Sequence, residues 1–162
     1  MLRRLALLLC FALTVASAQA RLGETLAQLK EHFGTPPDPK SPKGMLVWFV
    51  ESVDGPLVYT VTVNAKGVSI AEGMKPVKRG VMTQKIVQDF LEDQMTLTKD
   101  SKTARIVPPG EKYEFAKTAY TCGAKEWVLV DDTRGVLLIW SREGVQSVMA
   151  VTREMMLRNA GG

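Results

Sequence analysis

The sequence contains few of the residues that most often carry catalysis or bind metals. Among its 162 residues there are two cysteines, Cys10 and Cys122, and one histidine, His32. Zinc sites draw three or four ligands, chiefly from His and Cys, so this supply is too small for one. A nucleophile–base pair would have to combine Cys122 with His32, which can meet only through the fold. The place of His32 beside Phe33, near the end of an expected helix, favours a structural or surface role.

Motifs that bind phosphate or activate a serine are also absent. The chain has no GxxxxGK(S/T), no GxGxxG and no GxSxG segment. The acidic pair Asp131-Asp132 falls where a hairpin turn is expected, which favours a turn over a calcium loop. The basic group Lys75, Lys78 and Arg79 has no interleaved aromatic residues on which bases could stack. We therefore expect no catalytic, cofactor-binding or metal residues, no cofactor and no nucleic-acid partner.

What the chain does have is a start typical of bacterial export. Arg3 and Arg4 supply positive charge, residues 5–16 form an apolar run, and Ala18-Gln19-Ala20 supplies small residues at a cut. This pattern predicts a signal peptide, residues 1–20, cleaved after Ala20. The mature chain would be periplasmic or secreted.

Three alternatives to a cleaved peptide fit the N-terminal sequence less well. The apolar run is twelve residues long, whereas a membrane-spanning helix needs about 20. A buried N-terminal helix fits poorly with the abrupt polar change at Gln19. A lipoprotein anchor at Cys10 would need a small residue before the cysteine, and Leu9 is not small.

Removal of residues 1–20 changes the charge and the cysteine chemistry. The formal net charge of +4 falls to +2, because 19 basic residues then face 17 acidic ones. Cys122 would have no partner for an internal disulfide, so we expect a buried thiol. Residues 21–162 are enough for a single domain with its own core.

The first half of the mature chain predicts a helix followed by a three-stranded meander. Leu22, Leu26, Leu29 and Phe33 share one face of a helix over 24–33, with Thr25 and Gln28 at capping-box spacing and Gly34 as its cap. Strands are expected over 45–53, 57–63 and 68–74, joined by short turns that make them antiparallel.

The second half repeats this plan with more strands. Thr83 caps a helix over 84–95, and the polar segment 96–111 is expected to be a mobile loop. Strands follow over 112–116, 119–122, 126–131, 136–142 and 145–151, and Thr152 caps a last helix. The order predicts an α+β fold, an antiparallel β-meander sheet with helices packed on one face. The shared plan of the two halves is also compatible with a degenerate helix-plus-meander duplication.

The stretch Gly23-Glu24-Thr25, Leu29 and Gly34-Thr35-Pro36 resembles the opening of small exported domains of the outer-membrane-lipoprotein and β-lactamase-inhibitor-protein type. The chain is also similar to uncharacterised small secreted bacterial proteins. The resemblance implies scaffolding of an envelope complex or inhibition of an enzyme. The chain departs from it by lacking a lipid-bearing cysteine and by having only Cys122 where the inhibitor has two disulfides. No functional residue can be carried over.

These observations predict a non-catalytic protein, either a binding protein or an envelope scaffold. Its partner would be a protein or a small ligand of the cell envelope. The alternative is a small secreted enzyme that uses Cys122, or an acid–base pair that the sequence does not reveal. The candidate surfaces are the 96–111 segment and an exposed face of the sheet.

Overall fold

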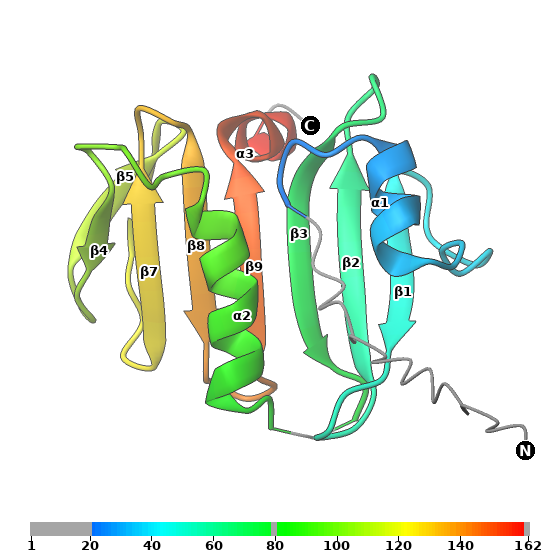
Figure 1. Cartoon of the computed structure of the whole chain (residues 1–162). Helices are drawn as coiled ribbons and strands as arrows, with labels where there is room; N and C mark the ends of the chain where they lie inside the picture. The colour runs from blue at the N-terminus through cyan, green and yellow to red at the C-terminus, as the bar shows by residue number, and fades with distance from the viewer. Residues whose placement is uncertain (1–20, 79–80, 161–162) are drawn as a thin grey trace, which may run out of the picture.

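The computed structural model describes residues 21–78 and 81–160, so the predicted signal peptide lies outside the described residues. Seven strands form one antiparallel sheet in the order β1-β2-β3-β9-β8-β7-β4, and β5 pairs with β6 in a separate hairpin (Figure 1). With three helices this is the predicted α+β fold. The strands are β1 (Met45–Val50), β2 (Leu57–Val63), β3 (Ser69–Pro76), β4 (Arg105–Val107), β5 (Lys112–Phe115), β6 (Thr118–Thr121), β7 (Glu126–Asp131), β8 (Val136–Ser141) and β9 (Ser147–Thr152).

Two meanders meet at the centre of the sheet. The pairing of β3 with β9, which sets Glu72 opposite Ala150, joins the β1–β3 unit to the β7–β9 unit. Strands β7 and β8 lie inside the sheet, and their runs of buried residues confirm the prediction of strands covered on both faces.

Helices α1 (Leu26–Phe33) and α2 (Gln84–Met95) cover the same face of the sheet (Figure 1). Leu29 and Phe90 from these helices pack with Tyr59, Val61 and Leu138 from the strands in one hydrophobic core. Alternate residues of the same strands point the other way. There Val128 and Leu137 pack against Phe115 of the β5–β6 hairpin in a second core.

The third helix, α3 (Arg153–Ala160), lies at one end of the sheet rather than on the face that carries α1 and α2 (Figure 1). It contacts β9 and β3, and its Met156 packs against the second core. Thr152 accepts a hydrogen bond from the Met155 amide, which confirms the predicted cap.

The predicted caps of the first helix are also present, with one change at its start. Thr25 and Gln28 form a capping box, and Gly34 ends the helix with φ of 62°. The helix begins at Leu26 and not at Glu24. The reason is that Glu24 accepts a hydrogen bond from the Ser69 amide, so its backbone follows the sheet.

The boundaries of the first and third strands differ from the prediction. The first strand stops at Val50, because Ser52 accepts from the Gly55 amide and so begins the turn early. The third strand runs over Ser69–Pro76 instead of 68–74. Its last two residues pair with Val58 and Leu57.

The 96–111 segment was expected to be a loop, but part of it has regular structure. It contains β4, which pairs with β7 and sets Ile106 opposite Leu129. Thr103 is tied to Asp131 by a hydrogen bond of 2.8 Å. The mobility of this segment stays a prediction.

The outer edge of β1 is covered by the proline-rich segment before it. The Val47 carbonyl accepts a hydrogen bond from the Asp38 amide, and the Val47 amide donates one to the Ser41 hydroxyl. These two bonds use the backbone groups of Val47 that face away from β2. At the opposite edge of the sheet, β4 is only three residues long.

Candidate functional site

Cys122 is a buried thiol with the surroundings of a structural cysteine. It is 1% exposed, follows β6, and belongs to the second hydrophobic core. Burial raises its pKa, and the nearby carboxylates of Glu126 and Glu111 raise it further. Because the thiolate is the reactive form, this environment opposes nucleophilic use of Cys122.

The structure does not bring His32 to Cys122. His32 lies in the last turn of α1, where its Nδ1 is 2.8 Å from Oε2 of Glu24. Helix α1 covers β1 and β2, whereas the β5–β6 hairpin lies at the opposite end of the sheet (Figure 1). The one nucleophile–base pair that the sequence allowed is therefore not assembled.

Asp131 is the last residue of β7, and Asp132 begins the predicted β7–β8 turn. One oxygen of the buried Asp131 carboxylate accepts hydrogen bonds from the Thr103 hydroxyl and the Arg134 amide. Burial alone would raise the pKa of Asp131, but hydrogen bonds, with that from Ser101 the strongest, hold it below its usual value. The neighbouring Asp132 pairs with Arg153 (Nη2 to Oδ1, 3.4 Å).

A buried carboxylate that the sequence analysis missed lies under α2. Glu72 of β3 is 2% exposed and accepts from three neutral side chains. The donors are the Tyr59 hydroxyl at 2.6 Å, the Ser69 hydroxyl at 2.6 Å and the Gln94 amide at 3.1 Å. The sequence feature that could have indicated this buried carboxylate is a single acidic residue inside an otherwise apolar strand, Ile70 to Met74.

This network changes the acid–base properties of two groups without exposing either. Burial raises the pKa of Glu72, although the three hydrogen bonds oppose the rise. Burial and the adjacent Glu72 carboxylate raise the pKa of Tyr59 well above its usual value. Because Glu72 and Tyr59 are both almost fully buried, a substrate does not reach them in this conformation. Their arrangement favours a structural tie between β2, β3 and α2.

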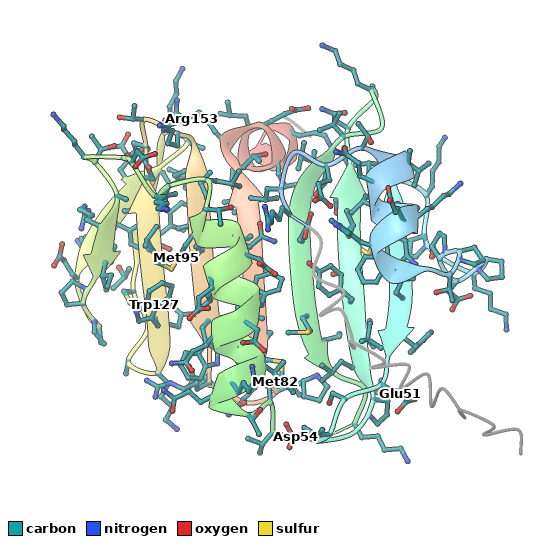
Figure 2. The ribbon with its side chains drawn as sticks, in the orientation of Figure 1. Glu51, Asp54, Met82, Met95, Trp127 and Arg153 are labelled. Carbon is teal, nitrogen blue, oxygen red and sulfur yellow. The ribbon has the colours of Figure 1, made fainter. Side chains whose placement is uncertain are left out.

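The candidate binding site is a groove between α2 and the β4 edge of the sheet, which we call the α2–β7 groove. It consists of two adjoining hollows, of about 420 and 520 Å³, which share Glu92 and Met95. Each volume is within the usual range of a small-molecule site. Met95 of α2 and Trp127 of β7 lie across the groove from each other (Figure 2).

The two hollows differ in their lining. The smaller one has Trp127 and Trp140 on its floor, and the α2 side chains Gln84, Gln88, Leu91 and Glu92 along its wall. The larger one is formed by the start of the 96–111 segment, with Ile106 and Leu129 on its floor. Its charged side chains are Glu92, Lys99 and Arg105, and Arg105 pairs with Glu111 at 3.0 Å.

The groove combines the predicted loop surface with a part of the sheet that helices leave open. Ile106 is 59% exposed although it points to the same face as the buried Leu129. The sequence indicated the loop as a candidate surface but did not reveal the groove. The pairing of β4 with β7 is what brings β4 close to α2, and the sequence does not show this pairing.

Among the described residues, no group of three or more His, Cys, Asp or Glu side chains is arranged to hold a metal ion. Within residues 21–78 and 81–160, no helix has the length and apolar character needed to cross a membrane. No family model matches the chain, and neither the curated proteins nor the solved structures yield a match to it.

Proposed function

We propose that the chain is an exported, non-catalytic binding protein that holds a small ligand in the α2–β7 groove. The observation that carries the proposal is the groove itself. It is open to solvent, it is lined by two tryptophans and by aliphatic side chains, and hydrogen-bonding groups surround them. Such a combination is typical of ligand sites, in which apolar groups supply affinity and a few polar groups set the orientation.

The candidate catalytic groups support binding over turnover. Cys122 is buried away from His32, and Glu72 is enclosed by its three donors. The groove lining contains carboxylate, amide and hydroxyl groups but no His or Cys.

Export rests on the N-terminal pattern. A cut after Ala20 would keep Leu22 in the mature chain. This residue is buried, and its amide donates a hydrogen bond of 3.0 Å to Gln94. We expect N-terminal sequencing of the protein from the periplasm or medium to begin at Arg21. A first residue beyond Leu22 would contradict the proposal, since the fold would have lost this anchor.

The groove is tested with Nile red, a neutral apolar dye whose fluorescence rises in apolar surroundings. We expect the protein to bind the dye, and Met95→Glu to weaken binding about tenfold by placing a charge in the groove. Met149→Glu is the matched control, because Met149 lies on the other face of the sheet with 39% exposure against 37% for Met95.

Two results would count against the groove as the binding site. One is equal weakening of dye binding by Met95→Glu and Met149→Glu. The other is dye binding that neither variant changes. Urea unfolding of both variants checks that any loss of binding is not a loss of fold.

A further inference from the structure

The smaller hollow of the α2–β7 groove has an aromatic floor made by neighbouring strands. Trp127 of β7 and Trp140 of β8 are direct partners in the sheet register, so their side chains lie side by side on one face. Leu91 and Met95 of α2 face them across the hollow. An aliphatic group would be well accommodated here, since indole rings offer large apolar surfaces.

Charge in this hollow has a single sign. Glu92 is its one charged lining residue, and Gln84 and Gln88 on the same side of α2 are neutral. Among the described residues, Glu92 forms no ion pair, whereas its neighbours Asp89 and Asp93 pair with Lys85 and Arg21. The hollow is therefore complementary to a positive charge.

One indole of this floor, Trp140, already has a cation of the protein over its ring. The guanidinium carbon of Arg142 lies 5.1 Å from the centre of the Trp140 ring, which is within the range of a cation–π contact. Arg142 does not line the hollow. Its position shows that this indole stacks with a cation in the protein's own fold.

We infer that the ligand of the α2–β7 groove is a small aliphatic ammonium ion. Its charged nitrogen would lie between the Trp127–Trp140 floor and the Glu92 carboxylate, and its alkyl chain would extend past Met95 towards Leu129. Indole faces and a carboxylate are a known means of recognising alkylated ammonium groups. This inference rests on the proposed function, because it specifies the ligand of that same groove.

The experiment measures displacement of Nile red by three compounds that share a six-carbon chain and differ in the charge of the head group: hexyltrimethylammonium, hexanol and hexanoate. We expect hexyltrimethylammonium to displace the dye at about one-tenth of the hexanol concentration and hexanoate to be the weakest. Glu92→Gln should weaken hexyltrimethylammonium about threefold and leave hexanol unchanged. Glu31→Gln, an exposed carboxylate on α1, is the control and should change neither.

The outcomes separate the ligand class from the site. If hexanol or hexanoate displaces the dye as well as the cation does, or if Glu92→Gln has no effect, the ammonium inference is overturned while the groove stands. A blocked Leu-Lys-Leu peptide that competes better than hexyltrimethylammonium also overturns it, in favour of a protein partner. If Met95→Glu leaves dye binding unchanged, the proposed function fails as well.

Discussion

The side-chain amide of Gln94 donates a hydrogen bond of 3.1 Å to the carboxylate of Glu72, while its carbonyl oxygen accepts from the Leu22 amide. One buried side chain thus connects the last turn of α2 to the sheet and to the start of the folded domain. Gln94 and Glu72 are both buried and bonded to each other. A change in the charge of Glu72 therefore acts directly on this connection.

The first prediction concerns the pH dependence of stability. Burial raises the pKa of Glu72 in the folded protein, so the folded state binds this proton more tightly than the unfolded state. Glu72 therefore lowers stability as pH rises above about 4.3, its usual unfolded value. We expect Glu72→Gln to gain stability relative to the wild type between pH 4 and pH 7, as measured by urea unfolding.

Two further variants check the cause of this difference. Glu72→Ala should lose about 3 kcal/mol at pH 7, since three buried donors would lose the carboxylate to which they donate. Glu114→Gln, at an exposed position of β5, is the control for the loss of one carboxylate. A wild type that gains stability relative to Glu72→Gln as pH rises would contradict the prediction.

The second prediction concerns the tie between the 96–111 segment and β7. Thr103→Val removes the hydroxyl that donates to the buried Asp131 carboxylate. We expect a loss of about 2 kcal/mol at pH 7, typical of a hydrogen bond to a charged group. Amide hydrogen exchange over residues 99–104 should also become faster.

Acidification should reduce the loss of stability caused by Thr103→Val. The pKa of Asp131 lies below its usual value in the folded state, so its carboxylate stabilises the fold above about pH 3.9 and loses that effect on acidification. The gap between wild type and Thr103→Val should therefore narrow at pH 2. Thr96→Val is the control, because the exposed Thr96 hydroxyl donates to the neutral Asp93 carbonyl. An equal loss of stability in Thr103→Val and Thr96→Val would contradict the proposed role of the Thr103–Asp131 hydrogen bond.

The third prediction concerns the two-residue turn of the β5–β6 hairpin. Ala116 and Lys117 have φ of 52° and 66°, in the left-handed region that favours glycine. We expect Lys117→Gly to stabilise the protein by about 0.5–1 kcal/mol, because the strain removed exceeds the added freedom of the unfolded chain. Lys112→Gly, within β5, should destabilise it instead, and stabilisation by both would contradict this account.

The fourth prediction concerns Cys122. Native protein at pH 7 should react with iodoacetamide at least about tenfold more slowly than protein in urea, since burial raises the pKa of the thiol. Free glutathione in the same buffers gives the reference rate. Fast native labelling would favour the alternative of a thiol enzyme.

Local signals predicted much of the fold. Capping residues act within four positions, and for this reason the capping box of Thr25 with Gln28 and the cap at Thr83 were predicted correctly, although the first helix was expected to begin at Glu24. The expected strands over 112–116 and 119–122 would leave Lys117-Thr118 as the turn, and the turn is one residue earlier. The register sets Phe115 opposite Thr118, which leaves Ala116 and Lys117 as the loop.

The features that depend on distant parts of the chain could not be predicted. The β3–β9 pairing joins residues that lie more than 70 positions apart, and neither strand signals its partner. The burial of Glu72 follows from that pairing and from the position of Gln94 above it. The larger hollow of the α2–β7 groove likewise depends on β4, which was expected as loop and which adds Arg105 and Ile106 to its lining.

The bonds from Asp38 and Ser41 to Val47 bear on how this domain behaves at high concentration. An exposed sheet edge is a template on which another chain can add a strand, and successive additions build fibrils. Here the proline-rich segment occupies the β1 edge, and proline nitrogens cannot donate hydrogen bonds to an incoming strand. The other edge of the seven-stranded sheet is β4, whose three residues offer a short template for an added strand in a crowded solution.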